Sequence, residues 1–180
     1  MRVPRTARHK AASLILWLGM LGLLLPACSH QSVRHLDRQP WSLNSTRSLE
    51  MNCRKFNYRC ARNADGLRVS GTAFPLREAI PEWAMWTQDI WLGAYLSDRE
   101  GQVLAKQIDI LSPQPYDPES GYSFDFLLQP QNMAGPGQIF ITFGYRLVLS
   151  DRRPDQQAAS SGDAAQPRLF FANELALNRL

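Results

Sequence analysis

Hydrophobic and polar residues alternate along most of the middle of the chain, beginning at Leu49 and ending at Leu149. Successive side chains of a β-strand point to opposite faces of a sheet, so a period of two predicts strands with one buried face. The pattern predicts about seven strands, over residues 49–54, 56–60, 67–74, 90–96, 103–110, 122–128 and 139–149.

Residues that favour turns separate these strands. Asn63–Gly66 and Ser97–Gly101 supply Asn, Asp, Ser and Gly, and Pro75 and Pro81 exclude a long helix between residues 75 and 88. Short strands with turns about every 8–12 residues are typical of two packed antiparallel sheets. The predicted fold class is therefore an all-β antiparallel β-sandwich, with its domain at residues 49–150.

The segments on either side of this domain have no sustained period. Residues 28–48 are polar and predict a flexible tether, and residues 151–167 predict a disordered linker. Residues 168–180 are apolar again. They are interpreted as an added edge strand, a short helix on the domain, or a peptide offered to a partner.

The first 27 residues have the composition of a secretory signal peptide. Basic residues precede an apolar run from Leu14 to Leu25, which is shorter than the roughly 20 residues that a permanent membrane helix needs. The sequence Leu25-Pro26-Ala27-Cys28 then resembles the lipobox of bacterial lipoproteins. This resemblance implies cleavage before Cys28 and acylation of its thiol. Because Ser29 follows, it also implies a periplasm-facing place on the outer membrane, with the inner membrane and the cell surface as the alternatives. The alternative is an ordinary signal peptide that leaves Cys28 free.

The net charge changes once this segment is removed. The whole chain has 20 basic and 16 acidic residues, a formal charge of +4. Four basic residues and no acidic ones lie in residues 1–27, so residues 28–180 have 16 of each sign. The basic isoelectric point therefore gives no support to nucleic-acid binding.

Two cysteines, Cys53 and Cys60, remain after Cys28. In an exported protein they predict a disulfide that closes a loop of eight residues. The alternative is two independent buried thiols. Two cysteines cannot form a four-thiolate zinc site, and their spacing is not that of a C-x-x-C redox motif.

From residue 67 onward the order of features resembles the FxLyD domains, which are small immunoglobulin-like sandwiches of exported bacterial proteins. The residues that carry the resemblance are Val69–Thr72, Ala94–Leu104 and the aromatic strand Gly121–Phe126. The resemblance implies an immunoglobulin-like sandwich, and a fold of this kind does not imply a function.

The residues needed for catalysis are sparse. His9 lies in the predicted signal peptide, and His30 and His35 lie in the predicted tether. The domain therefore lacks the histidine of a Ser-His-Asp or Cys-His site and of common metal sites. Acidic pairs at Asp98/Glu100 and Asp117/Glu119 are interpreted as turn residues. The sequence thus predicts no catalytic residues, no metal and no cofactor.

Two groups of residues are candidates for a binding surface. Trp83 and Trp86 form either a platform for a glycan or peptide, or, as we favour, a cover over one end of the sandwich. A basic group faces either lipid head groups or solvent on an edge hairpin; it comprises Arg54, Lys55, Arg59 and Arg62.

These observations favour a non-enzymatic outer-membrane lipoprotein that binds another envelope component, such as a pilotin-like or assembly factor. A glycan- or peptidoglycan-binding lipoprotein that uses Trp83 and Trp86 is the second hypothesis. An envelope hydrolase is the third, and the absence of a domain histidine argues against it.

Overall fold

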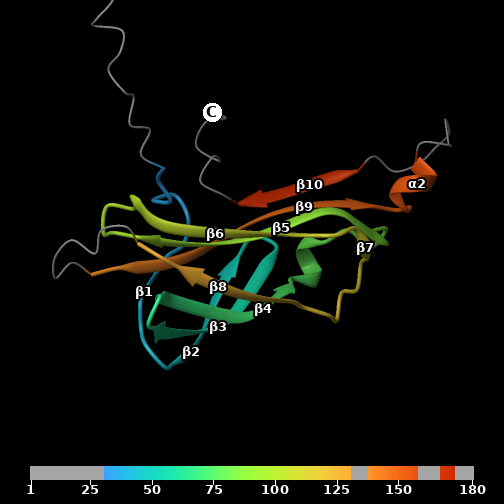
Figure 1. The fold of residues 1–180 in the computed structure, drawn as a ribbon. Coiled ribbons are helices and arrows are strands. Elements are labelled where there is room, and N and C mark those ends of the chain that lie inside the picture. The colour runs from blue at the N-terminus through green and yellow to red at the C-terminus, as the bar shows by residue number, and fades with distance from the viewer. Residues whose placement is uncertain (1–30, 131–137, 158–166, 173–180) are drawn as a thin grey trace, which may run out of the picture. The chain divides into compact units, whose positions relative to one another are not determined.

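The computed structural model describes residues 31–130, 138–157 and 167–172. The predicted signal peptide, Cys28 and His30 lie outside these ranges. Ten strands are present in the described part of the chain (Figure 1). They are β1 (Gln39–Pro40), β2 (Thr46–Met51), β3 (Arg54–Asn63), β4 (Gly66–Pro75), β5 (Trp86–Ser97), β6 (Val103–Leu111), β7 (Gln114–Pro115), β8 (Tyr122–Leu128), β9 (Phe140–Ser150) and β10 (Arg168–Ala172).

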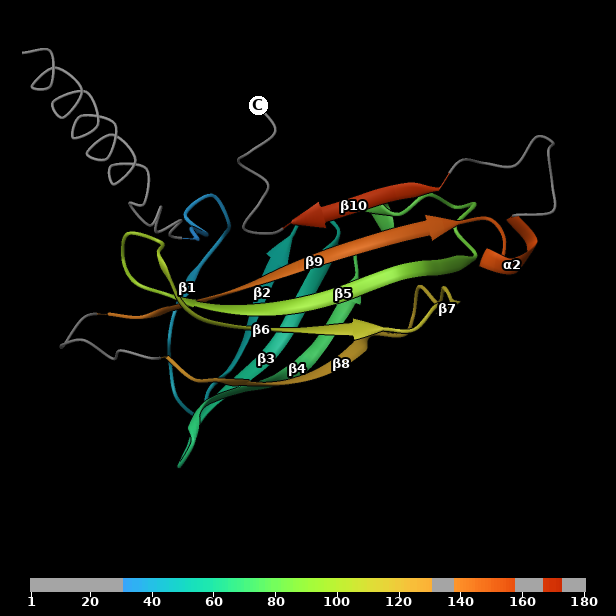
Figure 2. The ribbon, with the colours of Figure 1, turned by 45° about the horizontal axis from the view of Figure 1, so that its top comes forward.

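The strands form two antiparallel sheets, which confirms the predicted β-sandwich. One sheet has the order β2-β3-β4-β8. The other has the order β1-β9-β5-β6, with β10 also paired to β9 and β7 paired to β5. Figure 2 shows the strands of the two sheets crossing at an angle. The seven long strands are the seven that the alternating pattern predicts.

The strand order differs from that of an immunoglobulin domain. In the constant-type order, one sheet contains the first, second, fifth and fourth strands of the chain. Here the first, second, third and sixth long strands, β2, β3, β4 and β8, share a sheet. The molecule therefore has a sandwich architecture whose strand order differs from the constant-type immunoglobulin order.

Aromatic side chains between the sheets hold the sandwich together. Phe143 of β9 stacks on Phe56 of β3, with ring centroids 4.5 Å apart and planes 5° apart. Tyr58 meets the same Phe143 ring edge-on at 5.0 Å, and Phe124 of β8 lies 5.3 Å from it. Phe56 and Phe143 are fully buried. The alternating apolar residues of both sheets thus share one core.

Side-chain amides connect the edges of the two sheets. The Leu127 N–H of β8 donates to Oε1 of Gln107 on β6 at 2.7 Å. At the opposite edge, Nε2 of Gln39 in β1 donates to the Ser48 carbonyl of β2 at 2.8 Å. The Tyr58 hydroxyl donates to Oε1 of the same Gln39, also at 2.8 Å. Each glutamine therefore satisfies backbone or hydroxyl groups where the sheet ladder ends.

Residues 31–48 pack on the sandwich, so the prediction of a tether is wrong for them. Val33 is fully buried, and its N–H donates to the Gly101 carbonyl at 2.8 Å. β1 pairs with the start of β9, and Trp41 packs against the core. These apolar residues dock one by one along an irregular path, and a search for regular periods does not detect such a path.

The C-terminal segments are described in part. Residues 168–172 form the edge strand β10, which confirms the first of the three interpretations of this segment. Within the predicted disordered linker, residues Pro154–Gln157 form the short helix α2. Residues 158–166 and 173–180 lie outside the described ranges.

Candidate functional site

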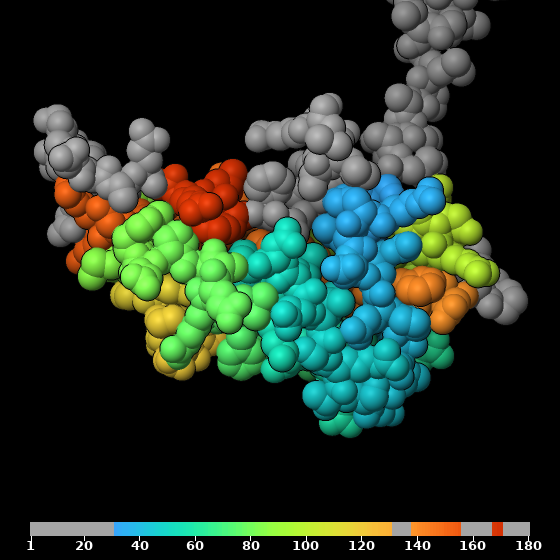
Figure 3. Space-filling model, turned by 180° about the vertical axis from the view of Figure 1, so that it is seen from behind, coloured from blue at the N-terminus to red at the C-terminus, as the bar shows by residue number. Residues whose placement is uncertain are grey.

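An open hollow lies where three segments distant in sequence meet, and we call it the acidic hollow. The segments are the stretch before β1, the turn between β2 and β3, and the 3₁₀ turn η2 (Arg77–Ala79). Figure 3 shows these three parts of the chain, in blue, teal and green, on one face of the molecule. The hollow has a volume of about 710 Å³ and is lined by Asp37, Glu50, Met51, Asn52, Leu76, Arg77, Glu78 and Ala79.

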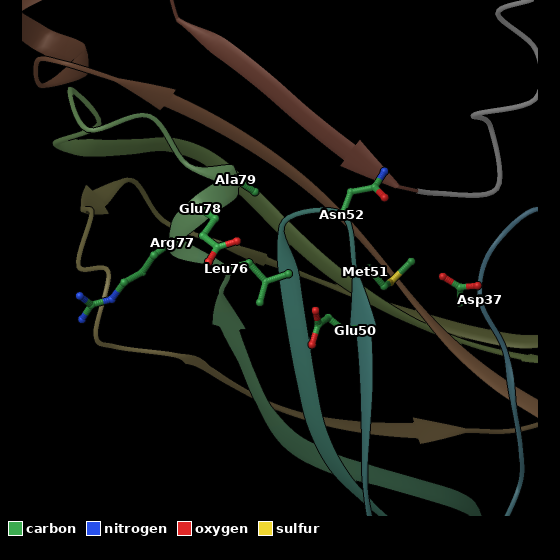
Figure 4. A pocket seen from close by; sticks show the side chains of 8 residues that line it. All are labelled: Asp37, Glu50, Met51, Asn52, Leu76, Arg77, Glu78 and Ala79. Carbon is green, nitrogen blue, oxygen red and sulfur yellow. The ribbon is translucent and has the colours of Figure 1, made fainter.

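The acidic hollow combines negative charge with apolar lining residues. Asp37, Glu50 and Glu78 are exposed, and within the described part of the chain none of them forms an ion pair. Arg77 pairs with Glu119, and its side chain extends away from the other lining residues (Figure 4). The hollow therefore presents three unpaired carboxylates beside apolar side chains, which come from Met51, Leu76 and Ala79.

The acidic hollow offers carboxylate, amide and apolar groups. Its described lining contains no Ser, Thr, Cys, His or Lys side chain. Its three carboxylates are exposed to solvent. Among the residues that the structure describes, no group of three or more His, Cys, Asp or Glu side chains is placed to hold a metal ion.

A buried cation lies near the hollow, at the start of β3. The side chain of Arg54 has no exposed surface, and its guanidinium lies 4.8 Å from the centre of the Tyr122 ring. Its nitrogens Nε, Nη1 and Nη2 have no hydrogen-bond partner among the described residues. The buried hydroxyl of Tyr116 also lacks a partner there.

The polar groups around Arg54 are neutral at physiological pH. Burial raises the pKa of the Cys53 thiol above its ordinary value. Burial also raises the pKa of the Tyr116 and Tyr145 hydroxyls. The Cys53 N–H donates to the Tyr145 hydroxyl at 3.2 Å. These neighbours therefore provide dipoles to the guanidinium, and no opposite charge.

The structure does not bring the four predicted basic residues together. Arg54 points into the core with Phe56 because the two residues have the same parity along β3. Lys55 and Arg59 have the other parity and point to the outer face, and Arg59 is exposed. Arg62 is exposed near the far end of the strand. The prediction of one surface containing Arg54, Lys55, Arg59 and Arg62 is therefore wrong.

The two tryptophans do not form a shared platform. Trp83 is half-buried and packs against the core, as the favoured interpretation predicts. Trp86 is half-buried at the start of β5, where the Arg153 guanidinium lies 5.1 Å from its ring centre. The next residue, Thr87, is fully buried, so alternation places Trp86 on the outer face of its sheet.

The predicted disulfide is also wrong, because Cys53 and Cys60 are both free and buried. Cys53 lies in the turn immediately before β3, and Cys60 lies within that strand. The six extended steps from Arg54 to Cys60 at ~3.3 Å each span ~20 Å, and Cys53 is one residue before Arg54, so the two Cα atoms are at least ~16 Å apart. A disulfide needs Cα atoms within about 7 Å. The alternative of two independent buried thiols is confirmed.

One aspartate of each acidic pair accepts hydrogen bonds within its own turn. Oδ1 of Asp98 accepts the Gln102 N–H at 2.8 Å in the β5–β6 hairpin. Asp117 accepts the Glu119 N–H at 2.8 Å and the Ser120 hydroxyl at 2.6 Å.

The described residues contain no helix with the length and hydropathy needed to cross a membrane. No family model, curated protein or solved structure matches the chain.

Proposed function

We propose that the chain is a lipid-anchored protein of the bacterial outer membrane whose sandwich binds another envelope protein and catalyses no reaction. The anchor rests on the sequence from Leu25 to Cys28, which resembles a lipobox. Binding rests on the acidic hollow, which is lined by unpaired carboxylates and by apolar side chains. An accessory or assembly role, such as that of a pilotin-like factor, follows from these two features together.

The charge of the hollow defines the chemistry of the partner. Three exposed carboxylates attract a basic side chain, and Met51, Leu76 and Ala79 offer contact to an apolar one. The volume of about 710 Å³ lies within the range of roughly 300–1,000 Å³ that is typical of ligand sites. A basic segment with neighbouring apolar residues, exposed on an envelope protein, is therefore the partner that fits.

The first experiment locates the partner by crosslinking in living cells. A photo-crosslinking amino acid replaces Asn52, which lines the hollow, or Asn63, which is exposed at the far end of β3. We expect one discrete adduct with an envelope protein from position 52 and none from position 63. Equal labelling from both positions, or no adduct from position 52, would contradict the proposed site.

A pair of charge-reversal variants tests whether the carboxylates carry the binding. Glu50→Lys combined with Glu78→Lys should abolish the adduct from position 52. Asp65→Lys combined with Glu100→Lys makes the same change of charge at exposed positions away from the hollow and should leave the adduct intact. An adduct that survives the first pair would show that the hollow charge does not hold the partner.

The anchor has a separate test. Cys28→Ser should abolish metabolic labelling with a fatty-acid probe and release the protein from the outer-membrane fraction. Persistent labelling of this variant would contradict the lipid anchor and leave the binding site untouched. No second function is proposed, because Trp83 packs against the core and Trp86 stacks with the Arg153 guanidinium.

A further inference from the structure

The first described residues are fixed to the turn of the β5–β6 hairpin. The Val103 N–H donates to the Gln31 carbonyl at 2.9 Å, and the Val33 N–H donates to the Gly101 carbonyl at 2.8 Å. Val33 is fully buried. Figure 3 shows the start of the described chain, in blue, beside this hairpin, in yellow-green. The chain therefore joins the sandwich at its first described residue.

Further contacts show that the hairpin turn is shaped for this attachment. A Cβ at Gly101 would lie 2.8 Å from the Cα of Arg34, so a side chain there would push the attached segment away. Nη1 of Arg38 donates to the Asp98 carbonyl at 3.0 Å, and the same nitrogen reaches the Arg99 carbonyl at 3.4 Å. The attachment thus uses both the backbone and the side chains of the segment.

This attachment makes the link to the proposed anchor short. A tether of residues 28–48 would let the domain move up to ~70 Å from the membrane. Only three steps separate Cys28 from Gln31, and by chain length alone they span at most ~11 Å. The head-group layer on each side of a bilayer is about 5–8 Å thick, and crossing it uses most of that length. Gln31, and the turn bonded to it, must therefore stay at the membrane surface.

The formal charges at this end of the sandwich balance. Residues 31–38 and 98–102 contain three arginines and three acidic residues, which are Arg34, Arg38, Arg99, Asp37, Asp98 and Glu100. Attraction to anionic lipid therefore does not determine the contact. The length of the link determines it, so the contact should form on zwitterionic lipid and persist at high salt.

We propose that the end of the sandwich formed by residues 31–34 and 98–102 rests on the lipid head groups of the leaflet that carries the anchor, held there by the short link. This inference rests on the proposed anchor and adds which part of the domain faces the membrane. It also narrows the class of partner. Asp37 of the acidic hollow follows six residues after Gln31 and so lies at most ~22 Å from it. The partner is therefore a protein embedded in, or bound to, the same membrane.

The experiment measures fluorescence quenching in the full acylated chain, reconstituted in phosphatidylcholine vesicles that contain a lipid with a nitroxide on its head group. A fluorescent amino acid replaces Gln102 or Ser112, which are both neutral and exposed. These positions flank β6, whose two ends are ~26 Å apart because eight strand steps separate them. We expect quenching at position 102 to be several-fold stronger than at position 112, at low and at high salt.

Flotation of the same vesicles separates this inference from the anchor itself. A chain that does not float with the vesicles would refute the anchor and this inference together. A chain that floats but shows equal quenching at the two positions, or none at position 102, would overturn this inference alone. The proposed anchor and the acidic hollow would then stand.

A pair of insertion variants tests whether the short link holds the contact. Twenty Gly and Ser residues inserted between His30 and Gln31 add a coil with a mean span of ~25 Å, and they should reduce the quenching at position 102 several-fold. The same residues inserted between Ala64 and Asp65, in the turn that joins β3 to β4, should leave it unchanged. Undiminished quenching after the first insertion would overturn the proposal, because the link would then not determine the contact.

Discussion

The extended strand β3 separates Cys53 from Cys60, and this geometry predicts how many thiols the protein contains. The six steps from Arg54 to Cys60 span ~20 Å at ~3.3 Å each, so the Cα atoms of the two cysteines are at least ~16 Å apart. Bridging them would require the β2–β3 hairpin and the β3–β4 ladder to come apart, since Cys60 pairs with Val69 in that ladder. Both cysteines should therefore remain free even in an oxidising compartment.

Burial controls how fast these thiols react in the folded protein. It raises the pKa of Cys60 from 9.0 to about 11, so that below both values the reactive thiolate is roughly 100-fold less abundant. Burial raises the pKa of Cys53 as well. A thiol reagent at about pH 8 should thus label the native protein very slowly. It should label the protein completely after unfolding in guanidinium chloride without reductant.

The number of thiols after unfolding distinguishes the alternatives. The chain has three cysteines, and the proposed acylation of Cys28 blocks one of them, so we expect two thiols per chain. Cys28→Ser should give the same number, whereas a fall from three to two in that variant would show that Cys28 is not acylated. Fewer than two thiols in the unfolded, unreduced protein would refute the strand geometry, because a Cys53–Cys60 disulfide would then exist.

Two further predictions concern stability. Phe143→Ala removes the ring that joins the two sheets and should lower the free energy of unfolding in urea by about 3–5 kcal/mol. Phe140→Ala, on a half-buried residue of the same strand, should lower it by at most about half as much. Equal losses in the two variants would contradict the described core. Asp125→Asn should cause a small loss at neutral pH, because the hydrogen bond from Arg68 lowers the pKa of the Asp125 carboxyl. The Arg68–Asp125 pair stabilises the fold above the ordinary pKa of Asp, and this contribution is lost as the pH falls through the lowered pKa of Asp125. The difference in urea midpoint between the variant and the parent should therefore vanish in acid. A difference that persists there would argue against the ion pair.

The seven long strands were predictable because each one buries a single face. Phe124 and Phe126 of β8 alternate with Ser123 and Asp125, and the structure places the first pair in the core and the second outside. The same local rule also identifies Arg54, since it shares its parity with Phe56 and Tyr58. Grouping Arg54 with the nearby basic residues by charge alone hid that information.

Other features depend on contacts between distant residues, and no local pattern encodes them. Asp37, Glu50 and Glu78 come from a loop, a strand and a 3₁₀ turn, and only the folded chain brings them around one hollow. Val33 and Trp41 lie in a polar stretch, yet both pack on the sandwich. The disulfide prediction was wrong for a related reason, because it rested on the number of cysteines and an oxidising compartment, whereas the extended strand β3 keeps the two cysteines apart.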